Sequence, residues 1–259
     1  MTDITTKEQI TWCPGCTNFL IKKAVEDALK ELIAEGYKHE EFAMVADIGC
    51  AGKIYDYINI SSINALHGRT LPTMTGIKIG NPKMNVIGFA GDGGTFDEGL
   101  DHFIHSCRYN NDMNFIVHNN QVFALTVGQA TALTESGYTE KTHPFGVKEQ
   151  PLNPIVLALE SGASFVARAN SLDPAAAKEI IKAGIKHKGF SFIEIIQPCI
   201  TFHDFREDLR KNAYPISPMN KDDAINEAKK WNYSHGKKIP IGIFYQEDRP
   251  TFEENYGLK

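Results

Sequence analysis

A glycine–aspartate–glycine tripeptide and a pair of asparagines have the residue types and the spacing to build one cation-assisted phosphate site. Gly91, Asp92 and Gly93 precede Asn119 and Asn120, with 25 residues between the two motifs. Glycines let a diphosphate approach the backbone N–H groups closely, and a carboxylate with an amide oxygen can hold Mg²⁺. Because a glycine–aspartate–glycine tripeptide is also common in plain turns, the elements around it decide between the two interpretations.

The flanking residues place both motifs at the ends of strands. Residues 84–90 form a short apolar run that predicts a buried strand ending at the tripeptide, and a helix is expected over 97–110. A second short strand over 113–118 ends at the asparagine pair. Open α/β sheets bind ligands at the carboxyl ends of their strands, so this setting favours a site over a plain turn.

The cysteines suggest a second site. Cys13 and Cys16 form a C-x-x-C turn, and Cys50 and Cys199 each follow a predicted strand. Four thiolates could hold a structural zinc or a [4Fe–4S] cluster, and spacing alone favours neither. A thioredoxin-like redox pair is weaker, because Cys13 does not follow a predicted strand. Free thiols that behave as small buried hydrophobes are the remaining alternative, which suits Cys107 in the middle of a helix.

The elements that must position these groups alternate along the chain, which predicts a parallel sheet with helices on both faces. Further helices are expected over 18–37, 71–79, 154–161 and 174–188, and further strands over 42–49, 164–169 and 190–196. We expect an α/β domain over residues 1–201. Residues 202–259 are expected to form a C-terminal arm that packs on the domain or on a partner, with a helix over 221–231 and an apolar segment over 239–245.

One loop and the bulk composition complete the organisation. Residues 127–151 are predicted to form a long loop, a feature that is usually functional or disordered. The chain has 259 residues, 42% hydrophobic and 23% charged residues and a net charge of −5, so nothing favours nucleic-acid binding. No signal peptide or bilayer-spanning run is evident, and an odd number of cysteines argues against a disulfide framework. We expect a soluble cytoplasmic protein.

The sequence resembles the thiamine diphosphate-binding β subunits of 2-oxoacid:ferredoxin oxidoreductases. The spacing of the tripeptide and the asparagine pair looks like the thiamine diphosphate signature, and the resemblance covers nearly the whole chain. The segments that carry it are 12–16, 48–53, 66–72, 75–78, 102–105, 119–126 and 238–245. These segments are specific together and in this order.

The resemblance implies a thiamine diphosphate-binding fold and names its ligands. It implies that Asp92, Asn120 and the backbone carbonyl of Val122 bind Mg²⁺. The cofactor itself would contact Gly49, Cys50, Ala51, His67, Gly91, Asp92, Gly93, Gly94, Asn120, Leu125 and Thr126. A [4Fe–4S] cluster would be ligated by Cys13, Cys16, Cys50 and Cys199, so that the thiamine has an electron acceptor nearby.

Several side chains have competing interpretations. The resemblance implies that His67 lies near the thiamine and the substrate carbonyl, although a histidine in a loop can simply be solvated. Lys53 could meet a substrate carboxylate or be an ordinary surface lysine. His102 and His105 share one helical face and are expected to be core or interface residues. Some relatives have lysine or glycine at the position of Val127, so the resemblance establishes no preference for 2-oxoglutarate, pyruvate or a branched-chain 2-oxoacid.

The implied activity is the coenzyme A-dependent oxidative decarboxylation of a 2-oxoacid to acyl-CoA and CO₂, with electrons passing to ferredoxin. The glutamate that activates thiamine is expected on a partner α subunit, in a heterodimer or heterotetramer. Two alternatives remain: a non-redox thiamine-dependent decarboxylase or ligase component, and a non-catalytic zinc-stabilised α/β module that binds a partner.

Overall fold

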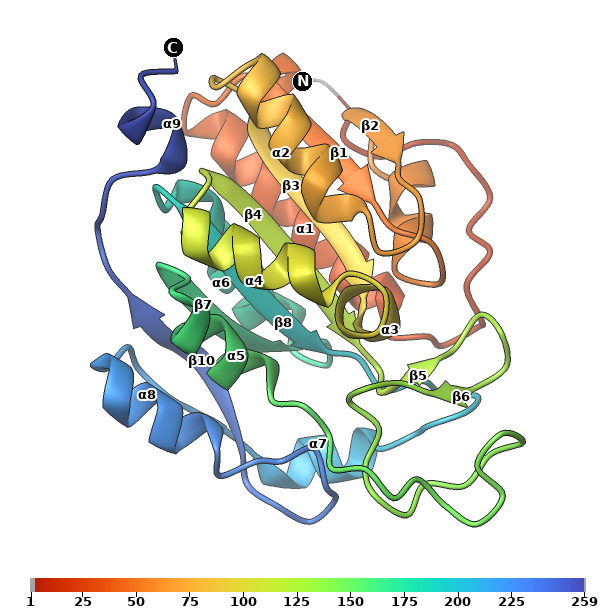
Figure 1. Ribbon diagram of the computed structural model, residues 1–259. Helices are drawn as coiled ribbons and strands as arrows, with labels where there is room; N and C mark the ends of the chain where they lie inside the picture. Colours follow the sequence, from red (N-terminus) through yellow and green to blue (C-terminus); the bar gives the residue numbers. More distant parts are fainter. Residues whose placement is uncertain (1–2, 259) are drawn as a thin grey trace.

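One eight-stranded sheet runs through the molecule, with helices on both of its faces (Figure 1). The computed structural model describes residues 3–258. The strand order is β2-β1-β3-β4-β8-β7-β10-β9. The bounds of these strands are β1 Phe42–Ala46, β2 Ser61–Asn64, β3 Asn85–Gly91, β4 Met113–Asn119, β7 Phe165–Asn170, β8 Phe190–Ile196, β9 Ala213–Pro215 and β10 Ile239–Gln246.

Six neighbouring strands, in the order β2, β1, β3, β4, β8 and β7, are paired parallel to one another, which confirms the predicted parallel α/β sheet. The two central strands, β4 and β8, are buried along their whole length and are rich in β-branched and aromatic residues. This composition is typical of strands covered on both faces. Because β3, β4 and β8 are neighbours in one direction, their carboxyl ends meet at a single edge of the sheet.

Helices cover the two faces and enclose two hydrophobic cores. On the near face in Figure 1 lie α2 (Thr70–Gly80), α4 (Leu100–Tyr109), α5 (Pro154–Ser161) and α8 (Lys221–Ala228), and behind the sheet lie α1 (Asn18–Ala34) and α6 (Pro174–Lys186). Pro174 is the first helical residue of α6, as predicted, and the side chain of Asp173 caps the helix by accepting a hydrogen bond from the backbone N–H of Ala176.

The C-terminal segment completes the sheet. Strand β10 pairs antiparallel with β7 and parallel with β9, so the sheet is mixed at this end. The helices α7 (Arg206–Asn212) and α9 (Phe252–Asn255) belong to the same segment. The apolar residues 239–245 therefore pack on the domain as a strand, which the sequence pattern showed only as an apolar segment.

The predicted helix over 97–110 is wrong at its start. The chain forms a short helix, α3 (Asp92–Phe96), directly after β3, and α4 begins only at Leu100. Asp92 is thus the first residue of a helix and not part of a free turn. The small elements η1 (His39–Glu41), η2 (Gly52–Asp56), β5 (Val122–Phe123) and β6 (Gln129–Ala130) were not predicted.

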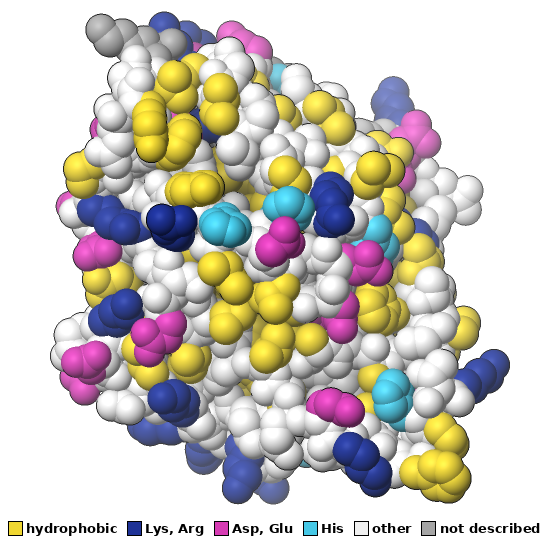
Figure 2. Space-filling view, in the orientation of Figure 1, with side chains coloured by type: hydrophobic (Ala, Val, Ile, Leu, Met, Phe, Trp, Pro, Cys, Tyr) yellow, Lys and Arg dark blue, Asp and Glu magenta, His cyan; other side chains and the backbone are white. Residues whose placement is uncertain are grey.

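Within the 127–151 loop, β6 pairs antiparallel with β5, which precedes the loop, and the rest of the loop contains turns and irregular backbone. Histidine side chains reach the surface of the near face among mixed apolar and charged residues (Figure 2). Among residues 3–258, no helix combines the length and the apolar character that a bilayer crossing requires.

Candidate active site

Polar side chains follow four neighbouring strands at one edge of the sheet. Asp47 comes directly after β1, Asp92 after β3, Asn120 after β4 and Gln197 after β8. The backbone N–H of Gln197 donates to the carbonyl of Asn119 at 2.8 Å, and that of Asp47 to the carbonyl of Phe89 at 2.8 Å. The sheet pairing thus continues to these residues and fixes where their side chains begin.

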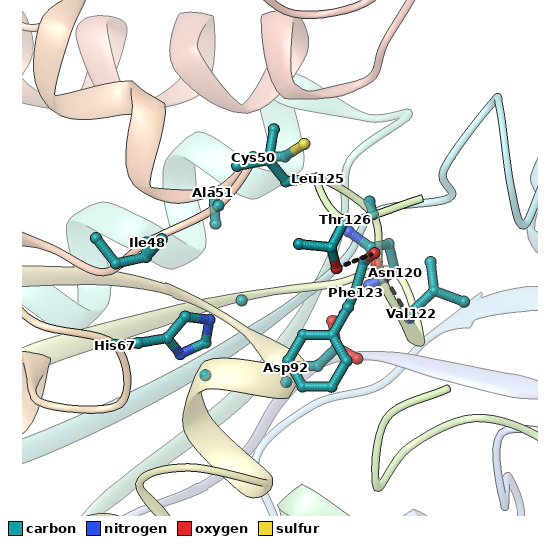
Figure 3. A pocket seen from close by; sticks show the side chains of 15 residues that line it. Ile48, Cys50, Ala51, His67, Asp92, Asn120, Val122, Phe123, Leu125 and Thr126 are labelled. Carbon is teal, nitrogen blue, oxygen red and sulfur yellow. Dashed lines mark hydrogen bonds between the residues drawn. The ribbon is translucent and has the colours of Figure 1, made fainter. Parts of the chain in front are cut away.

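A pocket with an empty volume of about 510 Å³ opens at this edge (Figure 3). It is lined by residues 48–51, 67, 91–94, 120 and 122–126. The structure thereby brings together every predicted thiamine-contacting residue around one cavity. The pocket is formed by segments that follow β1, β3 and β4, together with the loop that carries His67.

Asp92 is a buried carboxylate at the base of this pocket. It is 1% exposed, and its Oδ1 and Oδ2 accept hydrogen bonds from the backbone N–H of Asn120 at 3.3 Å and from the Thr131 hydroxyl at 2.6 Å. No lysine or arginine within residues 3–258 forms an ion pair with it. Burial raises its pKa to about 7. A buried carboxylate without a cationic partner fits a site for a bound metal ion, because a cation would offset the cost of its desolvation.

Asn120 and Val122 add possible oxygen ligands for a metal ion next to Asp92. The Asn120 side chain accepts a hydrogen bond from the backbone N–H of Val122 at 3.1 Å (Figure 3). It also donates to Gln197 Oε1 at 3.1 Å, and the two bonds together fix the direction of its amide. Oxygen ligands of this kind suit Mg²⁺. The residues present therefore fit the cation that the sequence motif implies.

Two glycines keep the pocket open. A Cβ atom at Gly93 would lie 2.2 Å from the Phe123 ring, and one at Gly94 would lie 1.7 Å from Asp47 Oδ2. Both distances are far below van der Waals contact. Glycine is therefore required at these two positions for steric reasons, independently of any phosphate.

His67 lies beside a buried carboxylate. Its Nδ1 is 4.0 Å from Oδ2 of Asp47, and neither atom has a hydrogen-bond partner among the described residues. The other carboxylate oxygen of Asp47 accepts the backbone N–H of Gly68 at 3.0 Å, and burial raises the pKa of Asp47. The His67 ring faces the pocket (Figure 3). The structure thus places His67 next to a buried carboxylate without a hydrogen bond between them, and its ring is open to a ligand in the pocket.

The four predicted cluster cysteines line a second pocket. Cys13, Cys16, Cys50 and Cys199 surround a cavity with an empty volume of about 370 Å³. This cavity shares Cys50, Asn120 and Ala124 with the first pocket. A group bound by the cysteines would thus be separated from a ligand in the first pocket by a single layer of residues.

Burial changes the acidity of two of the four thiols in the cysteine pocket. Burial, with smaller contributions from the other three thiols, raises the pKa of Cys16 to about 11, and burial also raises the pKa of Cys50. Within residues 3–258, no three of these sulfur atoms lie within 4.8 Å of one another. Four thiols around one cavity could hold either a single zinc ion or a [4Fe–4S] cluster.

Other predicted residues lie elsewhere. The Lys53 ammonium donates to the Thr11 carbonyl at 3.3 Å, and Lys53 does not line the first pocket. His105 is exposed and His102 is partly exposed on α4, so neither is a core residue. Cys107 is fully buried in the hydrophobic core. Val127 has a φ of 74°, which is unusual for a β-branched residue, and its side chain is 59% exposed.

Sequence reasoning missed three residues that support the site. Asp47 faces His67, Thr131 donates to Asp92, and Gln197 fixes Asn120. Asp47 and Gln197 carry the same signal as Asp92, a polar residue directly after a predicted buried strand. Thr131 lies in the long loop, and no sequence pattern connects it with Asp92.

Two family models match this chain and show which class of protein it belongs to. Residues 47–195 match the family model described as "Thiamine pyrophosphate enzyme, C-terminal TPP binding domain", and residues 199–258 match the model for the C-terminal part of the pyruvate ferredoxin oxidoreductase beta subunit. The chain is therefore a thiamine pyrophosphate enzyme domain joined to the C-terminal region of such a β subunit. It belongs to the β-subunit family of the 2-oxoacid:ferredoxin oxidoreductases.

Individual relatives agree with this family. The chain is 40% identical to the 2-oxoacid:ferredoxin oxidoreductase subunit beta of Saccharolobus solfataricus, over 94% of this chain and 84% of the relative. It is 37% identical to the 2-oxoglutarate synthase subunit KorB of Archaeoglobus fulgidus, over 94% and 87% of the two chains. A solved 2-oxoglutarate:ferredoxin oxidoreductase from Magnetococcus marinus, with 2-oxoglutarate, coenzyme A and succinyl-CoA bound, superposes with a TM-score of 0.92 at 30% identity, covering 98% and 87%.

Proposed function

We propose that this chain is the thiamine diphosphate- and cluster-binding β subunit of an enzyme that oxidises a 2-oxoacid to acyl-CoA and CO₂. The main support for this proposal is that the two pockets share lining residues. Cys50, Asn120 and Ala124 belong to both, so a site for decarboxylation and a site for electron acceptance share one wall. A non-redox thiamine enzyme has no need of the second site.

Asp92, Asn120 and the Val122 carbonyl would hold Mg²⁺, which in turn holds the diphosphate. Bound thiamine supplies an electron sink for decarboxylation of the 2-oxoacid. Gly91, Gly93 and Gly94 let the diphosphate approach the backbone, and Gly49, Ala51, Leu125 and Thr126 line the rest of the cavity. The protein thus contributes position and electrostatics around the cofactor.

His67 is placed to serve the substrate end of the same pocket. With Nδ1 turned towards Asp47, its Nε2 can donate a hydrogen bond to a substrate carbonyl oxygen. Lys53 donates to the Thr11 carbonyl, and its charge lowers the pKa of Cys50 against the larger opposing effect of burial. We therefore propose that Lys53 acts on the cluster side or on a carboxylate that reaches that side.

Cys13, Cys16, Cys50 and Cys199 would ligate a [4Fe–4S] cluster, which passes electrons singly to ferredoxin. The wall that their pocket shares with the thiamine pocket supports a redox cluster over a structural zinc ion. A partner α subunit would supply the glutamate that activates thiamine, and coenzyme A would accept the acyl group in the assembled heterodimer or heterotetramer. The Magnetococcus marinus structure holds coenzyme A and 2-oxoglutarate, and this supports the same substrate classes here.

Cofactor retention tests the first half of this proposal. The Asp92→Asn variant keeps the shape of the side chain and removes the charge, so Mg²⁺-dependent binding of thiamine diphosphate should weaken at least tenfold, about the lower bound for disturbing a metal site. Asp101→Asn, an exposed aspartate on α4, is the matched control and should bind as the wild type does. Equal cofactor retention in the two variants would place the cation elsewhere.

The visible spectrum of the anaerobically purified protein tests the second half. A brown sample whose broad absorption bleaches on reduction supports the cluster. A colourless sample with one zinc ion in the cysteine pocket would overturn the redox proposal, while leaving the thiamine site intact.

A further inference from the structure

Three side chains outside both pockets converge on one point. Glu135 comes from the long 127–151 loop, His203 from the segment after β8, and His235 from the segment before β10. Their carboxylate oxygen and ring nitrogen atoms all lie within 4.8 Å of one another. Glu135 Oε1 is 2.7 Å from His235 Nε2 and 3.5 Å from His203 Nε2. Sites with two histidines and one carboxylate are common ligand sets for zinc and related divalent metals.

The other ring nitrogen of each histidine has a partner that orients it. Nδ1 of His203 lies 3.1 Å from the Asn120 carbonyl oxygen, and Nδ1 of His235 lies 3.7 Å from Oδ2 of Asp208. Metal-bound histidines usually present such a partner behind the ligating nitrogen, because it fixes the tautomer and the ring orientation. Both Nε2 atoms are left facing Glu135.

The hydrogen-bond inventory of His203 points to a cation at the centre. The Asn120 carbonyl can only accept, so Nδ1 of His203 donates to it and Nε2 of the neutral ring carries a lone pair. An ionised Glu135 also offers only acceptors, so Nε2 of His203 and Oε1 of Glu135 face each other as two acceptors 3.5 Å apart. His235 Nε2, 2.7 Å from Oε1, can donate to Glu135 but leaves the lone pair of the buried His203 unused, whereas a metal ion would use both.

We propose that Glu135, His203 and His235 bind a divalent transition-metal ion of the zinc class. Zinc bonds to nitrogen and oxygen of about 2.0–2.1 Å put neighbouring donor atoms about 3.3 Å apart in a tetrahedron, so small side-chain rotations suffice to reach that geometry. Glu135 and Asp208 together balance the charge of such an ion. His235 also lines a surface hollow beside α7, so one of the three ligands lies next to solvent.

The ion would fasten three segments that are distant in the sequence. Glu135 follows Thr131 and Thr134, and the hydroxyl of Thr134 donates to the Gln121 carbonyl at 2.5 Å. His203 contacts the Asn120 carbonyl and donates its backbone N–H to the Cys199 carbonyl at 2.9 Å. The ion would therefore have a structural role and hold these three segments together beside both pockets. This inference does not depend on the proposed function.

Zinc is the probe that tests the site. The full chain in its assembled form is purified anaerobically, dialysed against a chelator and titrated with Zn²⁺, and zinc and iron per chain are measured. His235→Ala and Glu135→Gln should each lose one zinc equivalent with unchanged iron content, and Asp208→Asn should weaken zinc binding about 10- to 100-fold. His143→Ala is the control, because His143 pairs with Glu140 at 2.6 Å in the same loop and has no third ligand in the described chain.

A second readout uses Co²⁺ in place of zinc. The wild type and His143→Ala should show a visible absorption band from bound Co²⁺ that His235→Ala and Glu135→Gln lack. Equal zinc stoichiometry and equal Co²⁺ spectra in all four proteins would overturn the proposal, and the three residues would then be a proton-linked charge cluster.

Discussion

The backbone N–H of Asn120 donates a hydrogen bond to Oδ1 of Asp92 at 3.3 Å, although the two residues are 28 positions apart. The contact exists because β3 and β4 are parallel neighbours whose carboxyl ends meet at one edge of the sheet. It converts a spacing in the sequence into a compact set of oxygen atoms around a buried carboxylate. The same edge places Asn120 against the cysteine pocket.

The close approach of Gly94 to Asp47 gives a steric prediction. In Gly94→Ala, the new Cβ would lie 1.7 Å from Oδ2 of Asp47, so Asp47 must move and the first pocket must change shape. We expect a loss of roughly 1–3 kcal/mol in the free energy of unfolding and weaker thiamine diphosphate binding by calorimetry. Gly76→Ala is the control, because its Cβ would meet nothing within 4 Å on exposed helix α2. That variant should be as stable as the wild type or more so.

The cysteine pocket predicts a selective loss of iron. Cys199→Ser should lose most of the iron and acid-labile sulfide, because one of four ligands is removed. Cys107→Ala should keep both, since Cys107 is buried in the hydrophobic core away from the pocket. Iron analysis of the two variants checks this, and an iron loss in both of them would point to a general folding defect.

A buried ion pair ties the C-terminal segment to the sheet. Arg168 donates to Glu194 at 2.6 Å, both side chains are fully buried, and Tyr233 and Asn119 also donate to Glu194. Glu194→Ala would leave the Arg168 charge without its partner, so the free energy of unfolding should fall by about 3–5 kcal/mol. Lys23→Ala breaks an exposed ion pair and should leave the urea midpoint unchanged. Equal midpoints for the two variants would contradict this prediction.

His187 predicts part of the acid sensitivity. Burial lowers its pKa below the ordinary value of 6.5, while Ser164 bonds to its Nε2 at 2.7 Å. The unfolded chain therefore binds a proton near pH 6.5, whereas the folded chain binds it only at lower pH. The stabilising contribution is complete above pH 6.5 and is lost as the pH falls below that value, by up to about 1.4 kcal/mol per pH unit.

Urea unfolding of the full chain at several pH values measures this effect. The difference in stability between wild type and His187→Gln should shrink as the pH falls from 7 to 5, which lies on either side of the ordinary pKa of 6.5. Parallel pH profiles for the two proteins would assign the acid sensitivity to other groups.

The sequence predicts the parallel strands β1, β3, β4, β7 and β8 because each is a short apolar run, but it does not predict the parallel edge strands β2, which is exposed, and β9, which has three residues. It does not show that residues 239–246 pair antiparallel with β7, since an apolar segment carries no information about its neighbour in the sheet. It also misplaces the start of the helix after β3, because three glycines near Asp92 conceal the short helix α3.

The first pocket follows from local motifs, whereas its supporting contacts do not. Asp92 and Asn120 are recognisable from residue type, spacing and position after a strand. Thr131 reaches Asp92, and His203 and His235 reach Glu135, only through the path of a long loop and the C-terminal segment. Such contacts depend on tertiary structure, and their sequence separations follow no motif.

Electron transfer between the two pockets is the central claim, and one measurement tests it directly. A 2-oxoacid and coenzyme A are added anaerobically to the protein assembled with its α subunit, and the visible absorption is followed. We predict bleaching of the cluster absorption in the wild type and none in Asp92→Asn. A wild-type spectrum that stays unchanged with pyruvate, 2-oxoglutarate and branched-chain 2-oxoacids, in a protein that holds both cofactors, would contradict the claim.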